Sequence, residues 1–302
     1  MLFDSENKVA AVIVTYNPEI GSLASLIKAI SLQVAEVIVV DNNSDNVYEY
    51  SSKIEVSSNV IIIKLHENKG LSTAQNLGIK NASDDVKFFL LFDQDSMVES
   101  DFVCKQLNCY KKLIDEGKKV AAVGPTFVDR VSKYKYPATI YKGPFLKRVE
   151  VCDIPTESTF IIASGSLIPK DILETVGLML DDFFIDFVDV EWCLRARKYG
   201  FLSYINPSST MQHSIGDLRI VLFGRMISLH SDFRKFYIYR NGIFMTRLNY
   251  IPLGYKIRVV VFNLIRTFLG IAVSKNKMKS LKASSKGWFH GFKGFNKISG
   301  WK

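Results

Sequence analysis

The chain has 302 residues, of which 48% are hydrophobic and 23% are charged. This composition excludes an intrinsically disordered chain, and the length provides for one large core, or for one core with an appendage. Four cysteines without a C-x-x-C pair exclude a disulfide scaffold and disfavour a zinc or redox motif, so a reduced, cytosolic setting is the simplest interpretation; the first residues show no secretory signal.

The net charge of +9 is distributed unevenly. Residues 1–218 carry 22 Lys and Arg against 29 Asp and Glu, a net charge of −7, whereas residues 219–302 carry 17 against a single acid, Asp232, a net charge of +16. We therefore predict a first domain over 1–218 and a basic C-terminal region over 219–302. The basic region is expected to face an anionic partner, either a membrane surface or nucleic acid.

The first hundred residues alternate apolar runs with segments of helical spacing. The apolar runs predict buried strands at Val9–Val14, Glu36–Val40, Val60–Leu65 and Lys87–Phe92. The intervening segments are Leu23–Ile30, a polar stretch around Val47–Ile54, and Leu71–Gly78. Strands alternating with helices predict an α/β fold with a mostly parallel sheet covered on both faces.

A polar, turn-prone cluster follows each of these four strands. The clusters are Thr15–Pro18, Asp41–Ser44, His66–Gly70 and Asp93–Ser96. In an open parallel sheet the ligand crevice lies at the carboxyl ends of the strands. The four clusters are therefore expected to share one functional edge.

The segment from 100 to 218 has a mixed pattern. Val120–Val123 and Thr159–Ile168 are predicted to be strands, and residues 129–158 are predicted to be a loop or short irregular strand. Val188–Tyr199 has the spacing of an amphipathic helix that ends at Gly200.

The basic region has aromatic and basic residues at helical spacing over 219–248. The most apolar stretch of the chain, Ile257–Val273, is interrupted by Arg258, Asn263 and Arg266, so it lacks the ~20 continuous apolar residues of a membrane span. It fits a helix lying in the membrane interface, followed by eight lysines and several aromatic residues. The alternative is a helical subdomain or an oligomer interface with a solvated basic face.

Carboxylates at two places suggest chemistry. Asp93-Gln94-Asp95 follows a buried strand. Two carboxylates in this position could bind Mg²⁺ or Mn²⁺, with substrate phosphates completing the coordination shell of the ion. The alternative is an exposed acidic turn. Asp189 and Glu191 open the predicted helix, where the helix dipole keeps a carboxylate ionised for use as a base; the alternative is plain capping.

Two further side chains have both a chemical and a structural interpretation. His213 lies in a polar segment that ends in glycine, and it is a candidate metal ligand. The alternative is a structural histidine whose ring nitrogens are satisfied by hydrogen bonds. The other three histidines are assigned structural roles. Asp41 could accept a hydrogen bond from N3–H of a uracil or thymine ring, or form an Asx turn, or both.

Five motifs in fixed order resemble the family 2 glycosyltransferases. They are VIVTYNP, VIVVDNNS, ENKGLSTAQNLGI, LFDQDS and FFIDFVDVEWCLRARKYGF, and they cover about residues 8–217. The last two motifs are most similar to those of bacterial dTDP-rhamnosyltransferases that build cell-surface polysaccharide such as O-antigen, capsule or cell-wall polymers.

The resemblance implies a GT-A domain, with a Rossmann-like sheet that binds a nucleotide-sugar. Asp189 is implied to be the catalytic base; Val188 replaces the Glu of the usual Glu-Asp pair. Asp95 and His213 are implied to be metal ligands. The implied donor-binding residues are Thr15, Tyr16, Asn17, Asp41, Asn43, Asn68, Gly70, Asn76, Asp93, Gln94 and Asp95.

The implied reaction is a metal-dependent, inverting transfer from dTDP-β-L-rhamnose to a hydroxyl of a glycan carried on a polyprenyl diphosphate. The enzyme would act as a peripheral protein at the cytoplasmic face of the bacterial inner membrane, as a monomer or an oligomer.

The alternatives are a UDP-hexose donor or a non-catalytic membrane-binding adaptor. A nicotinamide dehydrogenase would need G-x-G-x-x-G where this chain has TYNPEIG, and an aspartyl phosphatase would carry its D-x-D on the first strand. The −7 charge of the first 218 residues opposes nucleic-acid binding.

Overall fold

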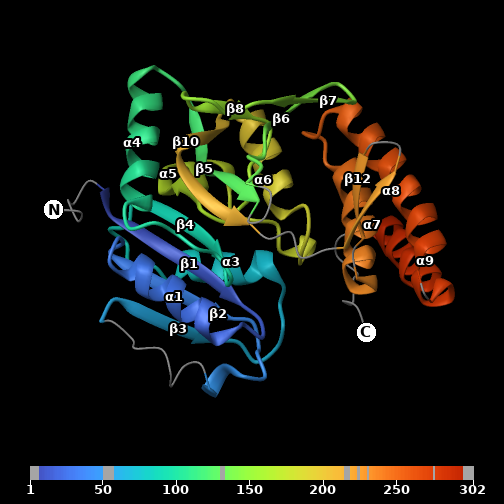
Figure 1. Ribbon diagram of the computed structural model, residues 1–302, viewed down its shortest axis with the longest axis horizontal. Helices are drawn as coiled ribbons and strands as arrows, with labels where there is room; N and C mark the ends of the chain where they lie inside the picture. Colours follow the sequence, from blue (N-terminus) through green and yellow to red (C-terminus); the bar gives the residue numbers. More distant parts are fainter. Residues whose placement is uncertain are drawn as a thin grey trace.

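The computed structural model describes residues 7–49, 58–129, 133–213, 218–222, 225–229, 231–274 and 276–294, with only the backbone described between 213 and 230. An eight-stranded sheet in the order β3-β2-β1-β4-β9-β5-β10-β8 forms its centre (Figure 1). The strands are β1 Val9–Thr15, β2 Glu36–Asp41, β3 Val60–Lys64, β4 Phe88–Asp93, β5 Val120–Asp129, β8 Thr156–Ser158, β9 Ser166–Pro169 and β10 Leu202–His213.

Parallel pairing joins β3, β2, β1 and β4, and it also joins β5 and β10. The strands β9 and β8 run antiparallel to their neighbours. The α/β class and the mostly parallel sheet are therefore confirmed. The four predicted N-terminal strands lie within one residue of their observed bounds, because their runs are rich in β-branched and aromatic residues; β1, β2 and β4 are buried, whereas the edge strand β3 is partly exposed.

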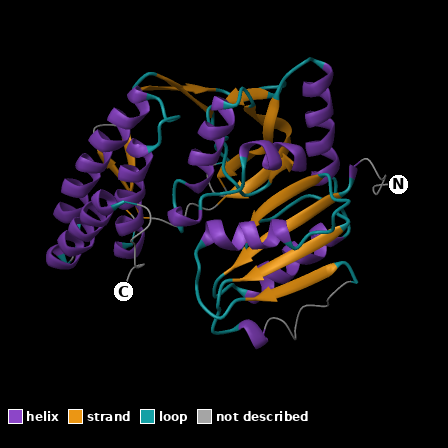
Figure 2. Cartoon of the chain, turned by 180° about the vertical axis from the view of Figure 1, so that it is seen from behind, coloured by secondary structure: helices purple, strands orange, loops and turns teal. Residues whose placement is uncertain are grey.

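Helices cover both faces of the sheet, as seen from behind in Figure 2. The helices with described bounds in the first 218 residues are α1 Ile20–Ser31, α3 Leu71–Lys80, α4 Phe102–Asp115, α5 Lys170–Val176 and α6 Val188–Lys198, with a short 3-10 turn at Asp181–Phe183. Residues 47–49 are also helical. One apolar cluster joins α1 and α4 to the sheet, and a second joins α5 and α6 to it. The predicted helix Val188–Tyr199 is thus confirmed, whereas the stretch around Val47–Ile54 lies largely outside the described residues.

The predicted strand Thr159–Ile168 was wrong in its first half. Only Ser166–Pro169 is a strand, and residues 159–165 form a loop that passes the carboxyl end of β4. Gly165 lies in the left-handed region at φ +75°, and a Cβ there would come within 2.3 Å of Met211 Sδ. The chain therefore turns at Gly165 against the neighbouring strand, which a strand-like apolar pattern does not reveal.

Two hairpins also depart from the sequence predictions. Residues 129–158 contain the hairpin β6 Ala138–Lys142 and β7 Phe145–Val149. Residues 219–231, predicted as the start of a helix, instead contain β11 Leu218–Leu222 and β12 Arg225–Leu229. Leu, Ile, Val and Met make up most of these two short strands, a composition that suits extended backbone as well as a helix.

The basic region forms three helices packed side by side, α7 Asp232–Arg247, α8 Leu253–Val273 and α9 Lys277–Lys293 (Figure 1). Side chains of α7 and α8, including Phe244, Met245 and Tyr255, belong to the same apolar cluster as α5 and α6. The bundle therefore shares a core with the sheet, and the boundary at residue 218 stays a prediction. No helix in the described ranges is both long and apolar enough to cross a membrane.

Candidate functional site

The ends of β1 and β2 are joined by a buried polar network. Asp41 is 1% exposed, and its carboxylate accepts hydrogen bonds from Thr15 Oγ1 at 3.0 Å, Ser44 N at 2.9 Å and Ser44 Oγ at 2.5 Å. The Ser44 N–H contact forms the predicted Asx turn, which a short acidic side chain favours at a strand end. The network fixes the Asp41–Ser44 loop beside the end of β1.

The loop after β1 is also tied to the loops after β2 and β4. Tyr16 N donates to Gln94 Oε1 at 2.7 Å, and Asp45 N donates to Asn17 Oδ1 at 2.8 Å. Asn17 and Asn43 both have left-handed backbones, at φ +47° and +68°, a conformation that asparagine tolerates well. Three predicted donor-binding clusters therefore meet at one edge, as the parallel topology requires.

The fourth cluster lies where the chain enters α3. Asn68 Oδ1 accepts from Gly70 N at 3.0 Å. Gly70 has φ +85°, and a Cβ there would lie 2.6 Å from the ring of Phe184, so only glycine fits. The turn that carries the implied donor-binding residues Asn68 and Gly70 is therefore packed directly on the segment that leads to Asp189.

Asn76 lies on α3 and faces the same segment. It is 5% exposed, accepts from Met179 N at 3.0 Å, and donates to Met179 O at 2.8 Å and to Asp181 Oδ1 at 2.9 Å. These hydrogen bonds hold α3 to residues 179–181, and this structural role explains why Asn76 is buried. The donor-binding role of Asn76 stays a prediction.

Asp93 and Asp95 end β4 in different environments. Asp95 is exposed, whereas Asp93 is partly buried, with its N–H donating to Ser164 Oγ at 3.2 Å. Burial, together with the charges of Asp95 and Asp189, raises the pKa of Asp93 to about 6. Asp93 at the end of β4 therefore lies close enough to Asp95 and to Asp189 of α6 for both charges to act on it.

Asp189 is the second residue of α6, at the positive end of its helix dipole. Its Oδ1 accepts from Val190 N at 2.8 Å, and the carboxylate also accepts from the Ala163 N–H. Burial outweighs these bonds and, with the nearby charge of Asp186, raises the pKa of Asp189 to about 6. The carboxylate is thus ionised at neutral pH but more basic than an ordinary aspartate, as a general base requires.

Glu191, the other acid in the first turn of α6, has a structural role. It is fully buried, forms an ion pair with Arg195 at 2.8 Å, and accepts a hydrogen bond from Tyr250. The carboxylate of Glu191 is therefore paired and hydrogen-bonded within the core, whereas Asp189 faces the other site carboxylates.

Sequence reasoning missed two site residues, Ser164 and Arg234. Ser164 is 3% exposed and holds both Asp93 N and Ser96 Oγ, the latter at 2.7 Å. Arg234 on α7 pairs with Asp186 at 2.5 Å, and its charge lowers the pKa of Asp93. The basic composition of 219–302 gave a signal for Arg234, but no motif separated it from the other sixteen basic residues.

The segment before Asp189 is held in an unusual backbone conformation. Phe184, Asp186 and Phe187 are all left-handed, at φ +61°, +65° and +66°. Asn241 on α7, which is fully buried, donates from Nδ2 to the carbonyl oxygens of Phe183, Ile185 and Asp186 at 2.7–2.9 Å. A bulky residue is rarely left-handed, so the contacts from α7 compensate for the strain.

The donor set at the strand edge fits a divalent cation. Asp93 and Asp95 present hard carboxylate oxygens, and the mutual repulsion that raises the pKa of Asp93 is what a cation relieves. Within the described ranges no group of three or more His, Cys, Asp and Glu side chains could hold a metal. Such a cation would therefore need further ligands, which substrate phosphates can provide. The predicted ligand His213 ends β10, and its side chain lies outside the described residues.

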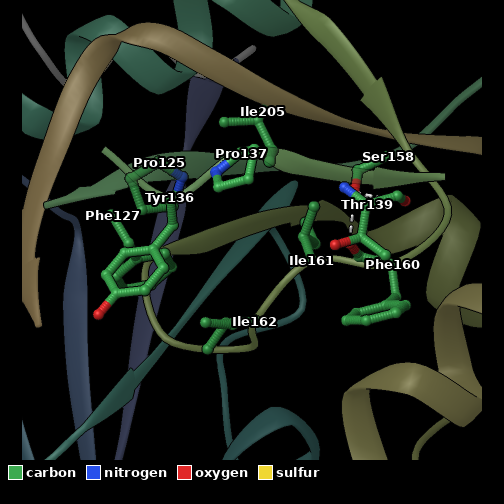
Figure 3. A pocket seen from close by; sticks show the side chains of 10 residues that line it. All are labelled: Pro125, Phe127, Tyr136, Pro137, Thr139, Ser158, Phe160, Ile161, Ile162 and Ile205. Atoms are coloured by element: carbon green, nitrogen blue, oxygen red, sulfur yellow. Dashed lines mark hydrogen bonds between the residues drawn. The ribbon is translucent and has the colours of Figure 1, made fainter. Parts of the chain in front are cut away.

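An apolar cavity of about 200 Å³ is lined by residues of the 159–165 loop, including Phe160, Ile161 and Ile162, and by residues of β5 and β10 (Figure 3). Figure 3 shows Tyr136 and Phe127 at one end and Phe160 and Ser158 at the other. Ile161 lines this cavity and also a smaller one that borders Asp189. The loop that carries Ser164 thus contributes to an apolar pocket and to the surroundings of Asp189.

Comparison with known proteins agrees with this geometry. The chain is 39% identical over 280 residues to the dTDP-rhamnosyl transferase RfbF of Shigella flexneri, covering 91% of this chain and 92% of that protein. It is 28% identical over 181 residues to a Methanococcus voltae protein named dolichyl N-acetyl-alpha-D-glucosaminyl phosphate 3-beta-D-2,3-diacetamido-2,3-dideoxy-beta-D-glucuronosyltransferase, covering 57% of this chain and 55% of that protein.

Solved structures show the same fold at low sequence identity. GalNAc-T7 with UDP, GalNAc and Mn²⁺ has a TM-score of 0.57 at 14% identity, covering 91% of this chain and 56% of that one. Residues 1–349 of S. aureus TarS, in complex with UDP-GlcNAc, have a TM-score of 0.55 at 14% identity, covering 94% and 79%. The model of the Glycosyl transferase family 2 matches residues 10–177. The chain is therefore a glycosyltransferase and belongs to glycosyl transferase family 2.

Proposed function

We propose that the enzyme transfers rhamnose from dTDP-β-L-rhamnose to a hydroxyl of a glycan carried on a polyprenyl diphosphate, in the synthesis of a bacterial surface polysaccharide. The observation that carries the reaction type is that Asp93, at the end of β4, has both Asp95 and Asp189 as charged neighbours, although Asp189 lies almost a hundred residues further along the chain. The similarity to RfbF over nine-tenths of both chains supports the choice of donor.

The donor would lie across the ends of β1, β2 and β4. Thymine and ribose would contact Thr15–Asn17 and Asp41–Asn43, and the diphosphate would lie beside Asp95. Mg²⁺ or Mn²⁺ held by Asp95 and by the phosphates would neutralise charge on the departing nucleotide. Arg234 places a further positive charge near Asp93, which would help to stabilise that charge.

The transfer itself needs one base. A carboxylate oxygen of Asp189 takes the proton of the acceptor hydroxyl, whose oxygen forms a bond to the anomeric carbon. The bond from that carbon to the diphosphate breaks, and dTDP leaves with the electron pair. Attack from the face opposite the leaving group inverts the anomeric centre, so a β-linked donor gives an α-linked rhamnoside. The enzyme would work as a peripheral protein at the cytoplasmic face of the inner membrane, where its acceptor lipid would lie.

A donor screen tests the proposal. The purified protein is heated with dTDP-rhamnose, UDP-galactose, UDP-glucose or UDP-N-acetylglucosamine, each with Mn²⁺ or with EDTA, and the unfolding midpoint is read. Because a ligand stabilises the state that binds it, dTDP-rhamnose with Mn²⁺ should raise the midpoint most, and EDTA should remove most of that rise. A larger rise with a UDP-hexose would reject the rhamnosyl donor while leaving the family assignment intact.

A further inference from the structure

The solvent face of α8 is entirely apolar. All eight exposed residues of this helix are Leu, Ile, Val, Phe or Ala, and six of them form one stripe at helical spacing. We call this stripe the α8 ridge; it consists of Leu253, Ile257, Val261, Leu264, Ile265 and Phe268, which are 45–72% exposed. The solvent face of a surface helix is normally polar, and a contiguous exposed apolar patch marks an interaction site.

The neighbouring helix α9 adds positive charge to the same bundle. Its buried face is made of small residues, including Ala283, Gly287 and Gly291, which lie against α7 and α8. Its exposed face carries both lysines and large apolar side chains: Lys277, Met278, Lys279, Leu281, Lys282, Phe289, Phe292 and Lys293. Apolar and cationic side chains on one surface are typical of helices that lie at a lipid headgroup boundary.

We propose that the α8 ridge and the exposed face of α9 dock the enzyme onto the anionic surface of a lipid bilayer, with the ridge inserted at the acyl boundary and the lysines at the headgroups. Figures 1 and 2 both show α8 and α9 on the side of the molecule away from the sheet, so this surface is open to a flat partner. Insertion without crossing agrees with the sequence of α8, whose apolar run is interrupted by Lys256, Arg258 and Arg266, so that the helix is not apolar enough to cross a membrane.

Charge favours a bilayer over a second copy of the chain. The sequence from 233 to 302 contains no Asp or Glu, so two copies meeting through this face would bring lysines together without counter-charges. Anionic headgroups provide those counter-charges. The docking surface does not depend on the identity of the sugar donor.

Vesicle partition of the full chain tests the proposal. The protein is mixed with phosphatidylcholine vesicles that contain either no anionic lipid or about 30% phosphatidylglycerol, and the bound fraction is measured by flotation. We expect strong binding to the anionic vesicles only, and its loss in 1 M salt, where the screening length is about 3 Å.

Two pairs of variants separate the ridge from general surface effects. Ile257→Ser/Phe268→Ser should lower the partition coefficient by about tenfold or more, because each change removes a large apolar group from the inserted face. Leu32→Ser/Ile154→Ser, which alters side chains of similar exposure elsewhere, should leave it unchanged. Lys282→Glu/Lys293→Glu should reduce binding more than Lys118→Glu/Lys119→Glu, which changes the net charge equally.

Two results would overturn the proposal. One is equal partition of the wild type and the ridge variant; the other is a lipid-free dimer of the wild type that the ridge variant converts to a monomer. Nucleotide-induced thermal stabilisation, measured in parallel, should be the same in all variants. A failure of membrane docking is thereby distinguished from a failure of the proposed transfer reaction.

Discussion

The two site aspartates whose pKa values rise to about 6, Asp93 and Asp189, have different tasks that follow from their surroundings. Asp93 has Asp95 and Asp189 as like-charged neighbours, so it suits a site that gains a cation. Asp189 has hydrogen bonds from the backbone of Val190 and Ala163 that keep its carboxylate oriented. The proposed base is thus held in place by the loop that carries Ser164 and by its own helix.

Replacing the base tests its role without a change of shape. Asp189→Asn should lower kcat by roughly 10²–10⁴-fold, because the amide cannot take the hydroxyl proton. Asp171→Asn is a matched control: Asp171 lies in the first turn of α5 and also accepts from the next N–H, at 2.9 Å. Both variants should melt within a few degrees of the wild type. Activity of Asp189→Asn close to that of the control would contradict the assignment.

The same pKa values predict how stability depends on pH. The native state binds the protons of Asp93 and Asp189 more tightly than the unfolded chain does, since both pKa values rise from 3.8 to about 6. Their protonation therefore stabilises the fold fully below about pH 4, and this contribution is lost as the pH rises through about 6. Without metal or nucleotide, the unfolding free energy of Asp93→Asn should fall less than that of the wild type between these pH values. Denaturant melts measure the difference, and a steeper fall in the variant would speak against a desolvated Asp93.

At the scale of elements, the segment 182–187 connects the C-terminal bundle to the catalytic helix. Arg240 on α7 is 3% exposed and donates to the carbonyl oxygens of Asp182 and Phe183 at 2.6 and 3.0 Å. Asn241 holds the next carbonyls along the same strained segment. The orientation of Asp189 therefore depends on side chains more than fifty residues later in the sequence.

Loss of the amide at 241 should affect catalysis as well as stability. Asn241→Ala removes the side-chain donor to the carbonyl oxygens of Ile185 and Asp186, while Phe183 O keeps its bond from Arg240. We therefore expect kcat to fall roughly 10- to 100-fold through misplacement of Asp189. The control is Asn263→Ala, which removes another buried asparagine that donates to a helix carbonyl, that of Ile238, at 3.3 Å. Both variants should lose stability, but kcat of Asn263→Ala measured below its melting range should stay within about twofold of the wild type. Similar losses of kcat in both variants would show that Asn241 has a purely structural role.

The elements that sequence could predict are those with a strong local period. The strands β1 to β4 and the helix α6 follow from apolar runs and helical spacing. The 159–165 loop could not be predicted, because TFIIASGSLI has a strand-like composition and the break depends on packing of Gly165 against Met211. Ser164 and Asn241 were missed for the same reason: their roles are contacts between distant segments, which leave no spacing in the sequence.

At the scale of the molecule, the charge division at residue 218 does not coincide with a division of the core. The cluster that contains Trp192 and Phe183 of the first part also contains Phe244 and Tyr255 of the bundle. Arg234 of the bundle also contacts the site, because it forms an ion pair with Asp186 and its charge lowers the pKa of Asp93. Membrane docking through α8 and α9 would therefore hold the strand edge at a fixed distance from the lipid that carries the proposed acceptor.

The most direct test of the account is the structure of the enzyme in complex with dTDP and Mn²⁺. We predict thymine beside Asp41, the diphosphate at the end of β4, and an anomalous manganese peak about 2.1 Å from an oxygen of Asp95 and from phosphate oxygens. Asp189 should lie across the cleft from the diphosphate without contacting the metal. A nucleotide bound away from the ends of β1, β2 and β4, or a manganese ion without contact to Asp95, would contradict the central claim.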